Sequence, residues 1–368
     1  MPAMWRDWRN RLLMSPRFQR AAAAFPLTRP LARREARALF DVVAGFVYSQ
    51  VLLSCVRLGV LERLRDGPLT AAQLLPAETL APAPAATLLR AAAALELLEL
   101  RSADRWALGA RGAALLGNPG VLAMIEHHAL LYADLVDPLA MLRAPRGATA
   151  LARYWPYAAT AEPGQVDTAA TRAYTQLMSA SQGLVAEEIL DAYDVRRHHR
   201  VLDVGGGDGT FLRALAQRAP RLQLGLFDLP GVAAQAEERF AAAGLGGRVT
   251  IAAGDFDRDP LPPGADLITL VRVLHDHDDE RVDRLLAAAY AALPSGGVLL
   301  VAEPMAGTQG AERMGDAYFG LYLWAMGSGR PRTASDLAQR LQRAGFRRPR
   351  ERRTRVPLQT RVLVARRP

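Results

Sequence analysis

Three segments of this 368-residue chain each place a carboxylate within or at the end of an apolar run, and in two of them glycine adjoins the end of the run. Residues 201–209 read Val-Leu-Asp-Val-Gly-Gly-Gly-Asp-Gly, residues 222–228 end in Phe-Asp, and residues 249–256 end in Gly-Asp-Phe. Short apolar runs of this kind predict buried parallel strands, and ligands of open α/β sheets bind outside the carboxyl ends of such strands. The pattern predicts a ligand site at one sheet edge that carries several carboxylates.

The first segment narrows the class of ligand. Gly205, Gly207 and Gly209 form a GxGxG turn, and Thr210 stands where a dinucleotide fingerprint has its third glycine. Carboxylates in the segment, such as Asp203, would repel a pyrophosphate. A cation without phosphates fits better, and S-adenosylmethionine, with its sulfonium and ammonium groups, is the common one.

The next two strand ends supply candidate contacts for such a ligand. Asp228 lies 19 residues beyond Gly209, where an acidic side chain accepts hydrogen bonds from ribose hydroxyls. Asp255 could accept from an adenine amino group while Phe256 packs on the ring. The alternative for Asp228 is a cap on the helix that follows Pro230.

Two further strand ends carry a candidate base and its partner. His275 follows the apolar run 267–274 and has a pKa suited to removing a hydroxyl proton near neutral pH. Glu303 follows the run 298–302 and could orient the imidazole. A structural histidine and a turn-capping glutamate are the alternatives. A metal site at His275 and His277 is not predicted, because the acids that follow are typical of a helix start.

The elements that must position these residues alternate between strand and helix after residue 200. This alternation predicts an α/β fold with a Rossmann-like, doubly wound parallel sheet. The predicted strands lie near 201–204, 222–227, 249–252, 266–271 and 297–302, and an antiparallel pair near 350–356 and 361–365 closes the sheet.

The N-terminal half predicts a different kind of domain. Thr70 is a plausible N-cap, residues 85–98 predict a strong helix, and residues 100–108 resemble a hairpin. Helices followed by a two-stranded wing are typical of winged-helix domains. The predicted division is a basic arm (1–37), a winged-helix-like dimerisation domain (38–120), a helical linker with substrate-pocket helices (121–195) and a ligand-binding domain (196–368).

The composition of the chain indicates the cellular compartment in which it is expected. The single cysteine, Cys55, excludes a disulfide framework and favours a reducing cytoplasm. We expect no signal peptide, and no apolar run that approaches the roughly 18–20 residues of a spanning helix. Sites for a metal are not expected either.

The charge of the chain is concentrated at its two ends. Residues 1–37 hold nine arginines against Asp7 and Glu35, and residues 340–368 hold eleven against Glu351. Basic ends suggest an anionic partner such as a membrane surface or nucleic acid, and a solvated face is the plain alternative. The tryptophans among the first arginines are typical of an interfacial helix, with an arm packed on a dimer partner as the competing interpretation.

Taken together, the motifs resemble the S-adenosylmethionine-dependent O-methyltransferases of the caffeate and acetylserotonin type. The matching segments, in order, are 201–209, Phe227-Asp228-Leu229-Pro230, Gly254-Asp255-Phe256, 273–280, Ala302-Glu303-Pro304 and Arg332-Thr333. The resemblance covers about residues 38–368, and its winged-helix module mediates dimerisation in the family. It implies a homodimer, with S-adenosylhomocysteine as the product and no metal.

The resemblance also implies roles for individual residues. His275 is the base, aided by Glu303. The residues implied for the cofactor are Asp203, Gly205, Gly207, Gly209, Asp228, Asp255, Phe256 and Arg272. Family members often carry a second glutamate near the base, but here Pro331 takes that place.

The N-terminal half resembles a narrower group, the bacterial hydroxycarotenoid O-methyltransferases. The segments concerned are 15–20, 25–30, 40–41 and 45–50. This resemblance implies a small lipophilic hydroxylated substrate and peripheral contact with the inner membrane, without nucleic acid. Candidates for an apolar acceptor channel are Tyr174, Met178, Phe319, Tyr322, Trp324 and Met326, with core or dimer packing as the alternative.

Two other functions stay open at this stage. One is an O-methyltransferase for a phenol. The other is a winged-helix DNA-binding regulator that senses S-adenosylmethionine. The regulator is disfavoured because the predicted helix at 85–98 offers only Arg90 as a phosphate-binding group, and because His275 and Glu303 would have no purpose in it.

Overall fold

The computed structural model of the chain describes residues 3–102, 104–155 and 168–368. For residues 3, 168–176 and 180 it describes the backbone only. The chain forms two compact units, Met1–Gly117 and Asn118–Pro368. Each is described by itself below.

The first unit consists of helices and a small antiparallel sheet of order β1-β3-β2. Thr70 caps α5, as predicted: its hydroxyl accepts from the Gln73 N–H, and the Gln73 side chain accepts from the Thr70 N–H. The elements are α1 (Ala3–Leu13), α2 (Pro16–Ala24), α3 (Arg29–Arg57), α4 (Val60–Arg63), β1 (Leu69–Thr70), α5 (Ala71–Leu74), α6 (Pro82–Ala94), β2 (Leu98–Ser102), β3 (Arg105–Leu108) and α7 (Ala110–Leu116).

One boundary in this unit differs from the prediction. The helix expected over 85–98 is α6, which ends at Ala94, and Leu98 already belongs to β2. The apolar run continues without a break in the sequence, so periodicity cannot mark the end of the helix. Glu96 adopts a left-handed backbone conformation with φ of 61°, and this residue turns the chain from the helix into the strand.

Helix α3 corrects the expectation about apolar runs. It is long and apolar enough, by length and composition, to cross a membrane, and only 11% of its most apolar 18-residue window is buried. Asp41 is the one charge in the stretch from residue 38 to residue 56. Helices in the cores of soluble proteins can be equally long and apolar, so length and composition alone do not assign α3 to a membrane.

The second unit is built on a seven-stranded sheet of order β6-β5-β4-β7-β8-β10-β9. The first five strands in this order pair in parallel, whereas β10 pairs antiparallel with both β8 and β9. Chain order reverses between β4 and β7, which is the switch point where such sheets bind ligands. The strands are β4 (Arg200–Val204), β5 (Gln223–Asp228), β6 (Val249–Ala253), β7 (Leu267–Val271), β8 (Val298–Glu303), β9 (Arg347–Arg352) and β10 (Arg361–Arg366).

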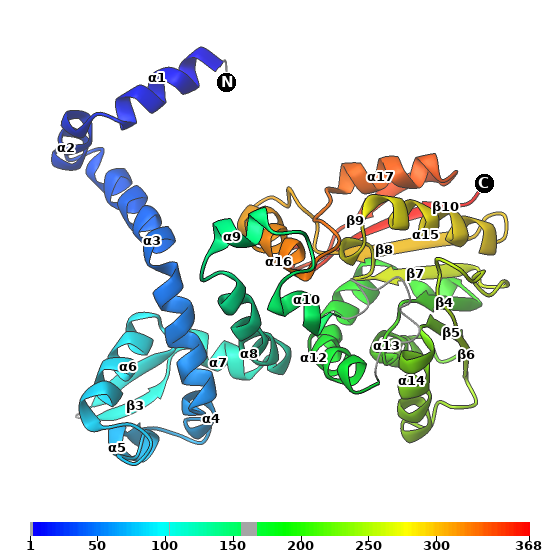
Figure 1. Cartoon of the computed structure of the whole chain (residues 1–368), viewed down its shortest axis with the longest axis horizontal. Coiled ribbons are helices and arrows are strands. Elements are labelled where there is room, and N and C mark those ends of the chain that lie inside the picture. The colour runs from blue at the N-terminus through cyan, green and yellow to red at the C-terminus, as the bar shows by residue number, and fades with distance from the viewer. Residues whose placement is uncertain (1–2, 103, 156–167) are drawn as a thin grey trace. The chain divides into compact units, whose positions relative to one another are not determined.

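Helices cover both faces of this sheet, as Figure 1 shows. Alternate strand residues point to opposite faces: Val201 packs in a core with α12, α13 and α14, and Leu202 packs in a core with α15 and α17. The doubly wound α/β prediction is therefore confirmed. The α-helices are α8 (Pro119–Asp134), α9 (Pro138–Arg143), α10 (Ala150–Tyr154), α12 (Thr168–Ala192), α13 (Thr210–Arg218), α14 (Pro230–Ala242), α15 (Asp279–Ala292), α16 (Phe319–Met326) and α17 (Ala334–Arg343).

The described part of the second unit also contains three shorter helical segments. Two are 3-10 helices, at Val195–Arg197 and Leu274–Asp276, and one is a π-helix at Arg313–Tyr318 that runs into α16. The predicted closing strand at 350–356 is displaced, since β9 occupies Arg347–Arg352. This strand carries arginines on both faces and no apolar alternation that could mark its register.

Candidate active site

The glycine turn after β4 forms one wall of a cavity at the carboxyl edge of the sheet. Gly205, Gly207 and Gly209 all have left-handed φ values, of 69°, 61° and 76°. A side chain at Gly209 would collide with the Phe240 ring, whereas one at Gly207 would meet nothing within 4 Å. The turn therefore needs glycine for its backbone, and at Gly207 it leaves open space for a ligand.

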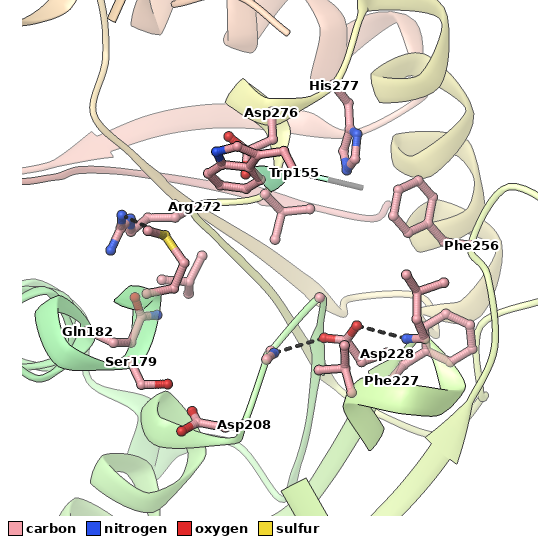
Figure 2. Close-up of a pocket in the computed structure, with 18 of the residues that line it drawn as sticks. Trp155, Ser179, Gln182, Asp208, Phe227, Asp228, Phe256, Arg272, Asp276 and His277 are labelled. Atoms are coloured by element: carbon pink, nitrogen blue, oxygen red, sulfur yellow. Dashed lines mark hydrogen bonds between the residues drawn. The ribbon is translucent and has the colours of Figure 1, made fainter. Parts of the chain in front are cut away.

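The cavity brings together six of the predicted residues (Figure 2). They are Gly205, Gly207, Asp228, Phe256, Arg272 and Met178. In Figure 2 Phe256 lies near His277, and Arg272 and Asp276 lie on another side of the cavity near Trp155. Residues that follow β4, β6 and β7 thus meet residues of β5 and α12 at the switch point of the sheet.

Asp228 ends β5 and is held from two sides. Its Oδ2 accepts from the Gly207 N–H at 2.8 Å, and its Oδ1 accepts from the Leu229 N–H at 2.7 Å. Burial raises the pKa of this carboxyl to about 6, although the two backbone donors act against the rise. A carboxylate oxygen accepts more than one hydrogen bond, so Asp228 keeps acceptor capacity for a ligand in the cavity.

Three other predicted residues stand behind the cavity wall. Asp203 is fully buried, where its Oδ1 accepts from the Thr269 hydroxyl at 2.6 Å and its Oδ2 has no hydrogen-bond partner among the described residues. Burial raises its pKa to about 7. Asp255 accepts from the Asp257 N–H at 3.0 Å, and neither it nor Gly209 lines the cavity. Their direct contact with a ligand stays a prediction.

Arg272 brings a cation to the cavity. It follows β7 with a left-handed φ of 57°, and its N–H donates to the Ala302 carbonyl at 2.8 Å. Its guanidinium donates to the Ser181 hydroxyl at 2.7 Å and lies 3.3 Å from the Met178 sulfur. A guanidinium in this position suits an anionic group of a ligand, such as a carboxylate.

His275 and Glu303 meet as predicted. Glu303 ends β8, and its Oε1 accepts from the N–H groups of Val273 and Leu274 at 3.0 and 2.7 Å. Its Oε2 is hydrogen-bonded to Nδ1 of His275, and both side chains are buried. A carboxylate at Nδ1 favours the tautomer whose Nε2 is free to accept a proton.

Asp276, to which the sequence interpretation gave no role, lies at the other nitrogen of the ring. Its Oδ1 is 3.0 Å from Nε2 of His275, and the residue lines the cavity. Burial lowers the pKa of His275, but the negative charges of Asp276 and Glu303 outweigh it, so the pKa is raised. Burial raises the pKa of Asp276 itself to about 6, against the charge of His275.

The segment around Pro331 supports the base without a second glutamate. The Arg330 N–H donates to the His275 carbonyl at 3.1 Å. Arg332 is buried, and its guanidinium donates to the carbonyls of Leu274 and His277 at 2.7 Å each. Hydrogen bonds to the backbone of His275 and of its neighbours therefore fix this residue where the family resemblance implies a carboxylate.

Aromatic rings continue from the base toward α8. Phe319 presents its edge to His275, with ring centroids 5.9 Å apart. Tyr322 is hydrogen-bonded to His127 of α8 at 2.9 Å, and the neighbouring Tyr318 makes the same kind of pair with the next residue of α8 at 2.7 Å. Burial lowers the pKa of His127 to about 4, with a smaller contribution from the adjacent histidine.

The remaining acceptor candidates are placed differently. Trp324 packs under the guanidinium of Arg146 at 5.1 Å, and Met326 is fully buried in the core around α16. Tyr174 lies outside the residues whose side chains the structure describes. Among residues 3–102, 104–155 and 168–368, no group of three or more metal-binding side chains occurs.

Several cavity residues had no role in the sequence interpretation. Trp155, Ser179 and Gln182 reach the cavity from the region of α10 and α12, and Arg281 reaches it from α15. Asp276 could have been found, since it directly follows the predicted base. The residues of α10 and α12 carry no local motif, and only tertiary packing brings them to the sheet edge.

Two family models match the chain: an O-methyltransferase domain over residues 144–347 and an O-methyltransferase dimerisation domain over residues 40–118. The demethylspheroidene O-methyltransferase of Cereibacter sphaeroides is 47% identical over 91% of this chain and 88% of its own. The enzyme of the same name from Rhodobacter capsulatus is 44% identical over 97% and 89%.

A solved structure supports the same relationship. Human N-acetylserotonin methyltransferase, determined in complex with SAM, superposes with a TM-score of 0.72 at 25% identity. The match covers 90% of this chain and 97% of the human one. The similarity therefore reaches into both units of this chain.

Proposed function

Since this chain belongs to the S-adenosylmethionine-dependent O-methyltransferases that carry their own dimerisation domain, we propose that it methylates the tertiary hydroxyl of an acyclic 1-hydroxycarotenoid. The acceptor is of the demethylspheroidene type, and S-adenosylhomocysteine is the second product. The observation that carries this proposal is the 47% identity to a demethylspheroidene O-methyltransferase over 91% of the chain.

The cavity residues fit S-adenosylmethionine, which supplies an electrophilic methyl group on a sulfonium. Asp228 would accept from the ribose hydroxyls, and Phe256 would pack on the adenine. Arg272 would pair with the carboxylate of the methionine part. The open space at Gly207 would let the backbone of the turn approach the ligand closely.

His275 is the proposed base. With Nδ1 held by Glu303, Nε2 would take the proton of the acceptor hydroxyl as the oxygen attacks the methyl carbon and the carbon–sulfur bond breaks. The nearby Asp276 carboxylate would stabilise the imidazolium that forms. A tertiary alcohol is a much weaker acid than a phenol, so proton removal accompanies methyl transfer and positioning contributes much of the rate.

The acceptor would reach His275 past the aromatic residues of α16 and its preceding π-helix. Phe319 lies against the base, and Met178 lines the cavity from α12. Trp324 and Met326 pack away from this path, in contact with Arg146 and in the core respectively. The proposed acceptor surface is therefore smaller than the set predicted from the sequence.

The dimerisation domain supports a homodimer. The matched residues include the part of α3 that exposes Phe40, Val43 and Phe46, and a second copy would cover this apolar face. We place the enzyme in the cytoplasm, at the surface of the inner membrane, because a carotenoid acceptor is dissolved in lipid.

The test is methyl transfer from radiolabelled S-adenosylmethionine, with a 1-hydroxylated acyclic carotenoid in detergent and a catechol in parallel. We expect label in the carotenoid. Label in the catechol alone would keep the enzyme class and refute the carotenoid acceptor. Cofactor binding without transfer to either would refute both and favour a sensor of S-adenosylmethionine.

A further inference from the structure

The segment formed by α1 and α2, residues 3–27, precedes both matched family domains. The matched dimerisation domain begins only at residue 40, and the human structure is covered over 97% of its length by 90% of this chain. The match to the R. capsulatus enzyme covers 97% of this chain and must reach into the segment, which is longer than the uncovered part. The segment therefore lies before the family's dimerisation domain, and at least part of it matches the R. capsulatus enzyme.

Helix α1 carries an apolar stripe that the first unit does not bury. Met4, Trp5, Trp8 and Leu12 fall within about 100° of one helix face. The rings of Trp5 and Trp8 stack with centroids 4.8 Å apart, and 48% and 51% of these residues are exposed. Large aromatic residues that stay exposed mark an interaction surface.

Arginines flank this stripe and extend into α2. The segment contains one acidic residue, Asp7, and in the described part of the chain no carboxylate pairs with any of its arginines. These are Arg6, Arg9, Arg11, Arg17 and Arg20, all exposed. In α2 the exposed Phe18 lies on the face opposite to Arg20, so both helices separate an apolar face from a cationic one.

This distribution of charge and aromatic surface matches a bilayer interface. Amphipathic helices with arginines on the polar face and tryptophan on the other lie in the headgroup region, where indole rings are favoured. Unpaired guanidiniums complement anionic headgroups. A second copy of the chain also offers carboxylates, but the indole rings and the guanidiniums together match the headgroup boundary of a bilayer.

We propose that residues 3–27 dock the enzyme on a bilayer that contains anionic lipid. The α1 stripe and Phe18 enter the headgroup boundary, and the arginines contact lipid phosphates. The docking deepens the proposed location at the membrane surface, because it names the segment that makes the contact and the class of lipid that it meets. Its purpose, access to a lipid-dissolved acceptor, rests on the proposed function.

The test is flotation of the full-length protein with vesicles of phosphatidylcholine, or with vesicles in which a third of this lipid is phosphatidylglycerol. We expect binding to the anionic vesicles that weakens with added salt. The variants W5A/W8A and R6Q/R9Q/R11Q should each lose about tenfold or more in affinity. The matched control R347Q/R348Q/R350Q removes three exposed arginines of β9 and should bind as the wild type does.

The other outcomes overturn the docking proposal. Equal loss in the β9 control would mean that overall charge, not this segment, attracts the vesicles. A dimer that dissociates in W5A/W8A, measured by light scattering, would assign the stripe to a second copy. DNA binding that only the arginine variant loses would assign the segment to nucleic acid. Methyl transfer to the carotenoid in detergent, measured separately, tests the proposed function, so the two failures are distinguishable.

Discussion

The two halves of the proposed active site are encoded in different ways. On the cofactor side, Gly207, Asp228 and Phe256 each lie within a few residues of a strand end, and the parallel sheet aligns these ends. On the acceptor side, the hydrogen bond from His127 to Tyr322 joins residues 195 positions apart. The proposed cofactor contacts can therefore be recognised from short sequence motifs. The proposed acceptor contacts depend on helix packing between residues that are far apart in the sequence.

The largest effect should come from the base that both halves share. We expect H275A to lower turnover by roughly 10²- to 10⁴-fold, because the acceptor hydroxyl then loses its proton only to water. Binding of S-adenosylmethionine, measured by calorimetry, should survive, since His275 does not line the cavity. Near-normal turnover in this variant would remove His275 from the mechanism.

Two single-residue variants test whether the cofactor side and the acceptor side contribute separately to catalysis. D228A should raise the KM for S-adenosylmethionine by roughly 10- to 100-fold, the range for a lost hydrogen bond to a charged group, and leave the KM for the acceptor nearly unchanged. Y322F removes only the hydroxyl that contacts His127. It should raise the KM for the acceptor by a few-fold and spare the cofactor.

Steady-state kinetics with each substrate varied in turn would measure both effects. If each variant changed the KM for S-adenosylmethionine and the KM for the acceptor equally, the cofactor side and the acceptor side would act as one coupled site.

The smallest expected effect is a shift of the pH–rate profile. His275 acts as a base only when neutral, and its pKa is raised above the ordinary 6.5, so turnover should fall as the pH drops through that raised pKa. E303Q keeps the shape of the side chain and removes a negative charge beside the imidazole. The acid limb of the pH–rate profile should then move to lower pH by about one unit. An unmoved limb in E303Q would contradict the pairing.

The sequence predicted the sheet well because apolar strands followed by glycine and aspartate are unambiguous locally. The same property allowed roles for Asp228 and His275 to be proposed without the structure. Trp155 and His127 could not be found, since nothing near them in the sequence marks a site and packing alone brings them to their positions. The arginine-rich β9 was misplaced for a related reason: charge on both faces hides the register of an edge strand.

The glycines of the first turn and the arginine after β7 illustrate different uses of the left-handed conformation. At Gly209 the conformation carries little strain. At Arg272, with φ of 57°, it costs about 1–2 kcal/mol, and contacts with Ala302, Ser181 and Met178 hold it. The strain is imposed when the chain folds, so the guanidinium is already oriented before any ligand arrives. Part of the entropy of ordering this side chain is thereby lost during folding, and binding does not have to supply it.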